Sequence, residues 1–346
     1  MLENTPGMKF SAVDVARTGA EYLGGLVKPN GQFVYQLDHQ TGEVGPGYNV
    51  LRHCGTIWAM LDVYRMIGCS EQTLQAARRA GGYLLDQYLR FDHDIDAICI
   101  SEDNSIKLGG NGLAILALLS LSEVTGDQYI LHTAIRLGEY IVANRTADGD
   151  FIHKKFFKSQ KISAFRSDYY TGEALLALLA LFEKTKDVKW LEVAKERETE
   201  LAKVDYGVSE QSHWMLYALE VISRHHKTKE YFSHAAKIAR HILDYPEYRA
   251  SERSTPIACR SEGLLAFLRM TREGGVDSNL REACLAAIRE DLSLQFEYRR
   301  PDGAFVRGGD KDKRAEEMRI DYVQHNISGF LYYHLDGHSD AASQEK

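Results

Sequence analysis

The segment NGLAILALLSL (111–121) has no charged side chain and is apolar on almost every side when it is read as a helix. Four later segments are also apolar on most sides, with at most two charged residues each: TGEALLALLALFE (171–183), HWMLYALEVI (213–222), EGLLAFLRM (262–270) and HNISGFLYY (325–333). Helices that are apolar all round are buried on every side. The segments between them, such as SEQTLQAARRAGGYLLDQYL (70–89), carry one apolar stripe and one charged face, which is typical of outer helices.

This alternation predicts twelve helices, with an outer helix before each inner one. Their ranges are 11–26, 49–67, 70–90, 110–125, 127–144, 169–184, 188–203, 210–224, 229–243, 259–272, 278–298 and 321–334. The inner helices begin about 40 to 60 residues apart, a spacing that indicates a repeat of six helical hairpins. Almost nothing alternates with the period of two that a strand requires, so we expect no sheet.

A turn signature recurs between an outer helix and the next inner one. It reads NGQFVYQL at 30–37, DGDFIHK at 148–154 and PDGAFVRGG at 301–309. Each copy places an Asn or Asp before a glycine and then continues with an extended segment that contains an aromatic residue, as in a tight turn or short hairpin. The three copies support a true internal repeat.

With these hairpins the chain resembles the α/α-toroid superfamily, the (α/α)6 barrel of six-hairpin glycosidases, sugar epimerases, some polysaccharide lyases, terpenoid cyclases and lanthionine cyclases. The resemblance is one of architecture and runs from about Ser11 to Tyr333. It implies an all-α fold and one domain over residues 1–346, with a core at about 11–334 and a short flexible tail at 335–346. This fold hosts several chemistries, so function must be argued from the site.

The composition argues against a nucleic-acid partner and a membrane partner. The 346 residues are 44% hydrophobic and 26% charged, with a net charge of −7, and no basic stripe suits nucleic acid. We see no apolar run near the ~18 residues of a membrane span and no signal peptide at the N-terminus, so we expect no membrane partner. Five scattered cysteines without a CxxC pair indicate reduced thiols and a cytoplasmic protein.

Polar side chains gather where the inner helices begin. Because inner helices of such a ring run in one direction, their first residues should meet at one mouth. Helix capping explains some of these residues but not the basic and aromatic ones, since a cation at a helix N-terminus opposes the dipole. As catalytic candidates we name Asp168, Asp321, Glu262, His213 and His325. As substrate-binding candidates we name Tyr48, Asn49, Arg52, His53, Asn111, Arg166, Tyr169, Glu173, Trp214, Arg260 and Tyr322.

Paired carboxylates beside aromatic side chains favour a glycoside hydrolase, with Asp168 and either Asp321 or Glu262 as acid and base. The arginines at the mouth favour an acidic sugar or oligosaccharide. An alternative is a uronate epimerase or lyase in which histidine, tyrosine and arginine act in the same cavity. The oligomeric state is left open.

Two further alternatives remain. The nitrogen and sulfur donors of His53, Cys54, Cys259, His213 and His325 suit zinc, which lanthionine cyclases hold in a similar toroid. Consecutive residues such as His53 and Cys54 diverge on a helix, however, and the Cys-His-Gly arrangement of those cyclases is not matched, so we expect no metal and no cofactor. The last alternative is a non-catalytic toroid that binds a peptide.

Overall fold

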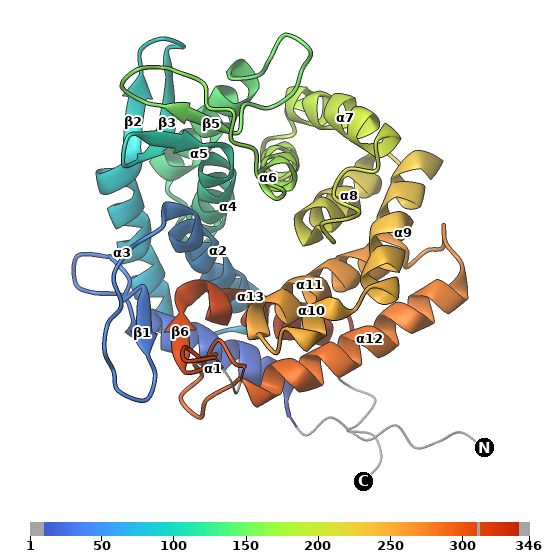
Figure 1. The fold of residues 1–346 in the computed structure, drawn as a ribbon. Coiled ribbons are helices and arrows are strands. Elements are labelled where there is room, and N and C mark those ends of the chain that lie inside the picture. Colours follow the sequence, from blue (N-terminus) through green and yellow to red (C-terminus); the bar gives the residue numbers. More distant parts are fainter. Residues whose placement is uncertain (1–9, 310–311, 339–346) are drawn as a thin grey trace.

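Six inner helices surround a central axis in the computed structural model, which describes residues 10–309 and 312–338. Each inner helix contacts the next, and the last contacts the first, so that they close one ring (Figure 1). The inner helices are α2 (Val50–Ile67), α4 (Leu108–Thr125), α6 (Tyr170–Thr185), α8 (His213–His225), α11 (Ser254–Met270) and α13 (Ile320–Leu335).

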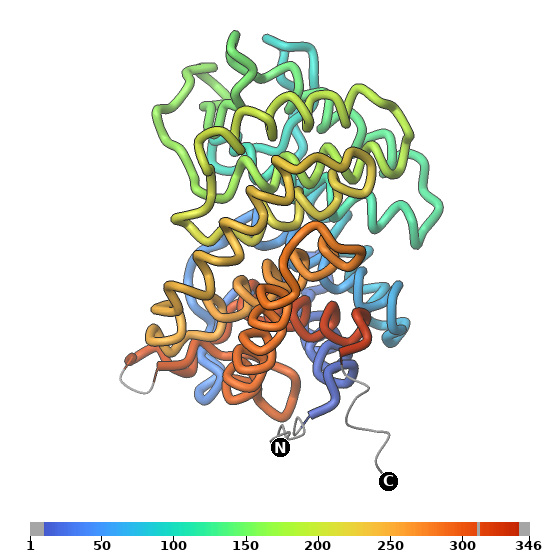
Figure 2. The backbone as a smooth tube through the Cα atoms, turned by 90° about the vertical axis from the view of Figure 1, so that its right-hand side faces the viewer, coloured from blue at the N-terminus to red at the C-terminus, as the bar shows by residue number. Residues whose placement is uncertain are grey.

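Outer helices surround this ring, each in contact with the inner helix that follows it in the chain or lies beside it. In the side view, α9 and α12 cross the near face of the molecule (Figure 2). The outer helices are α1 (Ala12–Gly25), α3 (Glu71–Tyr88), α5 (Gln128–Ala143), α7 (Val188–Lys203), α9 (Lys229–Asp244) and α12 (Ser278–Glu297), and a short α10 (Glu247–Ala250) precedes α11. The predicted (α/α)6 toroid is confirmed.

The inner helices are buried because their neighbours cover them on all sides. In α4 every residue from Leu108 to Ser122 is buried. By length and composition alone this helix could cross a membrane, contrary to our expectation that no segment would, but 83% of it is buried inside the ring. Its apolarity is explained by its place in the core.

Two glycines let neighbouring inner helices approach closely. A Cβ atom on Gly112 of α4 would lie 2.9 Å from the backbone oxygen of Glu173 on α6. A Cβ atom on Gly172 of α6 would lie 2.7 Å from the Cβ atom of Trp214 on α8. Both distances are shorter than real Cβ contacts, so any larger residue would push the two helices apart at the end where they carry polar groups.

The three turn signatures have the same structure. Their glycines, Gly31, Gly149 and Gly303, have φ angles of +89°, +83° and +99°, which favour glycine. In each copy the following phenylalanine bridges back to the end of the preceding outer helix and is buried, as in the pair Val27 and Phe33. The internal repeat is therefore visible in both the backbone and the core.

The expectation of no sheet is wrong. Four antiparallel strands, β2 (Leu89–Asp92), β3 (Ala97–Glu102), β4 (Ser105–Lys107) and β5 (Lys154–Phe156), form one sheet, and β1 (Gln36–Asp38) pairs with β6 (Glu317–Arg319). All six residues of β3 are buried, so this strand shows no alternation of apolar and polar residues. The other strands have three or four residues, which is too short for a periodic signal.

Two predicted boundaries also differ. Helix α11 begins at Ser254 rather than Cys259, so Cys259 and Glu262 lie inside the helix and not at its start. Of the predicted C-terminal tail, residues 339–346 lie outside the described part of the chain. Asp336 at its start is held by ion pairs with Arg269 and Arg272, at 3.3 and 3.0 Å.

Candidate active site

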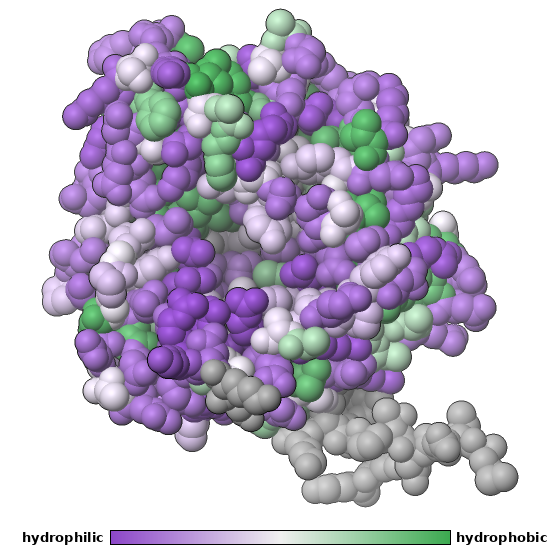
Figure 3. Space-filling view, in the orientation of Figure 1, coloured by the Kyte–Doolittle hydropathy of each residue, from purple (hydrophilic) through white to green (hydrophobic). Residues whose placement is uncertain are grey.

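A cavity of about 410 Å³ opens at the N-terminal ends of the inner helices. In the space-filling view it is the hollow at the centre of the face, framed largely by hydrophilic residues (Figure 3). All six inner helices contribute to its lining. The predicted residues that line it are Asn49, Arg52, Tyr169, Glu173, His213, Trp214, Arg260, Asp321 and His325.

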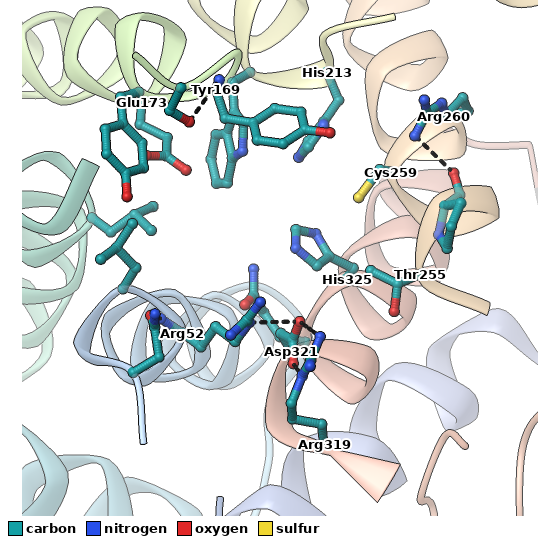
Figure 4. A pocket seen from close by; sticks show the side chains of 18 residues that line it. Arg52, Tyr169, Glu173, His213, Thr255, Cys259, Arg260, Arg319, Asp321 and His325 are labelled. Atoms are coloured by element: carbon teal, nitrogen blue, oxygen red, sulfur yellow. Dashed lines mark hydrogen bonds and ion pairs between the residues drawn. The ribbon is translucent and has the colours of Figure 1, made fainter. Parts of the chain in front are cut away.

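One wall of the cavity carries an array of two arginines around one aspartate (Figure 4). Arg319 donates to both carboxyl oxygens of Asp321, at 2.5 and 2.9 Å, and Arg52 donates through Nε to Oδ2 at 3.0 Å. Burial tends to raise the pKa of Asp321, but the hydrogen bond and charge of Arg319 and the charge of Arg52 outweigh it and hold the pKa below its ordinary value. Asp321 is therefore ionised, and the array keeps one positive charge in excess.

Two histidines face each other on α8 and α13. The ring centroids of His213 and His325 lie 5.4 Å apart, with the ring planes at 83°. Burial, followed by the positive charges of His325 and Arg260, lowers the pKa of His213 well below its ordinary value. For His325, burial acts in the same direction, but interactions with Cys259 and Glu262 outweigh it and raise its pKa well above the ordinary value. At neutral pH one ring is neutral and the other is an imidazolium.

Glu262 contacts His325 from outside the cavity lining. It is 2% exposed, does not line the cavity, and its Oε2 lies 2.8 Å from Nδ1 of His325. Among the described residues, Nε2 of His213 is buried without a hydrogen-bond partner. Buried polar groups are nearly always paired in folded proteins. An unpaired nitrogen in a cavity wall is available to a ligand.

Glu173 is a second polar group of the cavity lining with an unpaired atom. Its side chain is buried, and Oε2 has no hydrogen-bond partner in the part of the chain that the structure describes. Burial raises the pKa of Glu173 to about 8, with a smaller opposing effect of the His325 charge, so the carboxyl group is protonated at neutral pH. A side chain on Gly109 would collide with this carboxyl group, so glycine at 109 leaves room for it.

The predicted acid and base pair is not assembled. Asp168 is exposed and does not line the cavity, because it lies in the loop before α6 and not on the helix. Glu262 is held by His325, and its place on the third turn of α11 follows from the early start of that helix. Asp321 remains, but its hydrogen bonds to two arginines make it a poor proton acceptor.

Five predicted binding residues serve the fold instead of the cavity. Tyr48 and His53 are hydrogen-bonded to each other at 2.7 Å, and His53 also contacts the backbone oxygen of Ala80. Their side chains lie beneath the turn that contains Phe33, whose backbone donates to Tyr48. His53 is fully buried there and does not belong to the cluster of possible metal donors, although it was a donor in the zinc alternative.

The other three are held by side chains or backbone of the surrounding strands and loops. Asn111 accepts from the backbone of Ile100 and donates to that of Lys107. Tyr322 donates to Glu317 at 2.6 Å. Arg166 is half exposed and pairs with Asp150 at 2.9 Å. Strands β3, β4 and β6, which we did not predict, supply the partners of Asn111 and Tyr322, whereas the partner of Arg166 lies in the loop before β5.

The cavity also has lining residues outside our predicted set. Gln324 lies three residues after Asp321, a spacing that places both on one helix face and could have identified it. Thr255 and Pro256 belong to the first turn of α11, which the sequence did not reveal. The remaining members are Leu51, Leu113, Ser167, Tyr170, Cys259 and Arg319.

One group of side chains has the donor types of a metal site. His213, Cys259, Glu262 and His325 each offer one donor atom, and these atoms all lie within 4.8 Å of one another. This set differs from the expected zinc donors, because His53 and Cys54 are absent from it and Glu262 is added. The nitrogen, sulfur and oxygen donors are those that zinc prefers.

No protein-family model matches the sequence, and no curated protein matches it. Solved structures do match. A D-mannose isomerase aligns with a TM-score of 0.73 at 13% identity over 95% of this chain and 99% of its own. A family 76 glycoside hydrolase from a bovine Bacteroides thetaiotaomicron strain gives 0.72 at 11% identity, over 95% and 78%. Cellobiose 2-epimerase from Bacillus thermoamylovorans gives 0.71 at 16% identity, over 93% and 98%. The chain thus has the (α/α)6 fold that these isomerases, epimerases and glycoside hydrolases share.

Proposed function

We propose that the protein is a carbohydrate-active enzyme that epimerises or isomerises an acidic sugar by moving a proton at the carbon beside the carbonyl group. The observation that carries the proposal is the facing pair His213 and His325, whose pKa values are shifted in opposite directions. When the surroundings shift the pKa values of two neighbouring groups in opposite directions, the group with the lowered pKa can act as the base and the group with the raised pKa as the acid. This favours the epimerase alternative over the hydrolase that the sequence suggested first.

The chemistry needs one proton acceptor and one proton donor. Neutral His213 takes the proton from the carbon beside the carbonyl, and the electron pair of that C–H bond forms the carbon–carbon double bond of an enediol. The imidazolium of His325 gives its proton to the carbonyl oxygen, which receives the electron pair of the C=O bond. Return of a proton to the opposite face of the same carbon gives the epimer, and return to the neighbouring carbon gives the ketose or aldose isomer.

The charges of the cavity favour an anionic sugar. Three arginines, Arg52, Arg260 and Arg319, line it, and Asp321 neutralises one of them. Glu173 adds no negative charge at neutral pH because its pKa is raised. A carboxylate or phosphate on the substrate would meet this excess of positive charge, and arginine binds both groups with two parallel hydrogen bonds.

Hydrolysis of an acidic glycoside is the second candidate, and one observation favours it. The pKa of Glu173 is raised to about 8 while that of Asp321 is lowered, so the cavity holds one protonated and one ionised carboxyl group. Glycoside hydrolases use such a pair as acid and base or nucleophile. The solved structures with this fold include both reaction classes. The five cysteines, all free, support a cytoplasmic location for either enzyme.

Incubation in D2O with a panel of uronic acids, sugar phosphates, glycosides of uronic acids and matched neutral sugars, followed by proton NMR, separates the two. Epimerisation or isomerisation gives a new sugar and replaces the proton at the reacting carbon by deuterium. Hydrolysis of a glycoside gives a new reducing end without deuterium on carbon. A product of the second kind, unaffected by His213→Asn, would contradict the proposal.

A further inference from the structure

Cys259 is a cavity residue that neither takes nor gives a proton in the proposed transfer. Its thiol lines the cavity beside His325 and helps to keep that ring protonated. A sulfur atom next to an imidazole is also a pair of donor types that a metal can bind. The unpaired Nε2 of the buried His213 is a second, independent sign of a ligand at the same point.

The donor atoms come from three inner helices and converge. His213 stands on α8, Cys259 and Glu262 on α11, and His325 on α13. In Figure 4 the side chains of His213, Cys259 and His325 point toward the same part of the cavity. All donor atoms of the set lie within 4.8 Å of one another. Around a tetrahedral zinc ion, with bonds of about 2.0 Å to nitrogen and about 2.3 Å to sulfur, neighbouring donors stand about 3.5 Å apart. Side-chain movements of about an ångström therefore complete the geometry.

Glu262 has the position of an orienting partner. Its hydrogen bond to Nδ1 of His325 leaves Nε2 of that ring for a metal. Histidines that bind zinc commonly donate their other ring N–H to a carboxylate, which fixes the ring and strengthens it as a ligand. Glu262 is itself 2% exposed, so this orientation is rigid.

We propose that His213, Cys259 and His325 form a zinc site, with Glu262 holding His325 in place and the fourth position of the metal open to the cavity. Two nitrogen ligands, one sulfur ligand and an open position are a ligand set that zinc accepts. The site goes beyond the proposed function and does not rest on it.

Zinc binding and the proposed proton transfer exclude each other. The metal occupies the lone pair with which His213 accepts a proton, and it requires that His325 lose the proton which it would donate. The zinc-bound protein should therefore be inactive in epimerisation or isomerisation, and a chelator should restore activity.

The test is a cobalt titration of the full-length protein after treatment with a chelator. We expect one equivalent of Co²⁺ to bind with the visible absorption of a tetrahedral site and with a thiolate-to-cobalt band in the ultraviolet, and Zn²⁺ to displace it. Cys259→Ser should remove the ultraviolet band. Cys69→Ser is the matched control, because Cys69 is a free cysteine on the outer side of the ring, hydrogen-bonded to Thr73 of α3, and the band should persist. Glu262→Gln should keep the band and weaken binding about 10- to 100-fold.

The proposal falls if the wild-type protein binds no stoichiometric cobalt, or if Cys259→Ser, shown to be folded by circular dichroism, keeps the ultraviolet band. Turnover by the zinc-bound protein at the rate of the chelator-treated protein would contradict the exclusion. If turnover instead requires zinc, the site stands, but the roles proposed for His213 and His325 in proton transfer fall.

Discussion

Buried charged groups lie at both ends of the inner helices, and their pairing differs between the two ends. At the end away from the cavity, carboxyl groups are paired with arginines. Asp62 accepts from Arg65 at 3.0 Å, and Glu220 accepts from Arg224 at 2.6 Å. Asp336 is held by Arg269 and a second arginine. These pairs tie one helix turn to the next or one helix to its neighbour.

At the cavity end, the same helices leave polar atoms unpaired. Nε2 of His213 and Oε2 of Glu173 are buried without a hydrogen-bond partner among the described residues. An unsatisfied buried group costs about 1–3 kcal/mol, so its retention points to a ligand that completes it. The carboxyl groups named at the far end are all paired with arginines, whereas at the cavity end Asp321 is paired and Oε2 of Glu173 has no partner in the described part of the chain. Substitutions at the cavity end should therefore change activity more than stability. Substitutions at the far end should change stability more than activity.

The largest effect is expected at the histidine pair. His213→Asn and His325→Asn each remove a proton carrier, and turnover of the acidic sugar should fall about 10²- to 10⁴-fold. The midpoint of thermal unfolding should change little in His213→Asn, because Nε2 of that ring makes no hydrogen bond with the residues that the structure describes. It should fall in His325→Asn, because that ring also joins α13 to the buried Glu262 of α11. A steady-state assay with calorimetry on the same samples measures both quantities. Nearly full activity in either variant would remove that residue from the reaction.

Arg52 provides the next effect. Its guanidinium lines the cavity and shares Asp321 with Arg319. Hydrogen bonds to charged groups contribute about 1.5–3 kcal/mol, so Arg52→Met should raise KM for an anionic sugar about 10- to 100-fold and that for its neutral counterpart far less. Arg166→Met is the matched control, because Arg166 pairs with Asp150 and lies outside the cavity lining. Equal losses for charged and neutral sugars would contradict an anion-binding role.

The pH dependence of turnover tests Glu173. Its pKa is raised to about 8, so the carboxyl group is protonated below that pH and loses its proton as the pH rises through it. If the protonated form binds or protonates the sugar, activity should decline above about pH 8, and Glu173→Gln, which cannot ionise, should lack this decline. At pH 7 the substitution changes only a neutral hydrogen bond of about 0.5–1.5 kcal/mol, so turnover should fall by no more than about tenfold. An unchanged alkaline limb in the variant would assign the decline to another group.

Asp336→Asn probes the opposite end. The substitution removes two ion pairs and leaves the buried Arg269 with one fewer negative partner. The free energy of unfolding should fall by about 1–3 kcal/mol while turnover stays within about twofold. Denaturant unfolding and the activity assay are to be made at one pH. A loss of activity larger than the loss of folded protein would show that the two ends are coupled.

The ring could be predicted from the sequence because its signal repeats. Each inner helix, such as 111–121, is apolar on all faces, and the turn signatures with Gly31, Gly149 and Gly303 recur with the hairpins. The strands could not, because β3 is buried on both faces and the others are too short to show a period. Strands β2, β3 and β4 follow one another in the chain, but β1 pairs with the distant β6 and β5 with the distant β4, and such pairing leaves no local pattern.

The site was predictable in place but not in the roles of its residues. The common direction of the inner helices puts Arg52, Glu173 and Asp321 at one mouth, as the sequence indicated. Whether a side chain faces the cavity depends on about 100° of helix rotation per residue, and helix starts in a sequence are uncertain by more than that. Glu262 lies inside α11, which begins earlier than predicted, and contacts His325, while Tyr322 donates to Glu317 of the unpredicted β6.

Asp168 is the sharpest test of this last point, and the smallest effect is expected there. It lies in the loop before α6, exposed and outside the cavity lining, although its place at the predicted start of an inner helix made it a catalytic candidate. Asp168→Asn should leave turnover and thermal stability within about the ±0.5 kcal/mol typical of surface substitutions. Asp321→Asn, assayed beside it, should weaken binding because it releases Arg52 and Arg319 from their shared partner. If Asp168→Asn proved as damaging as His325→Asn, the loop would have to close over the sugar, and the exposed rim would belong to the site.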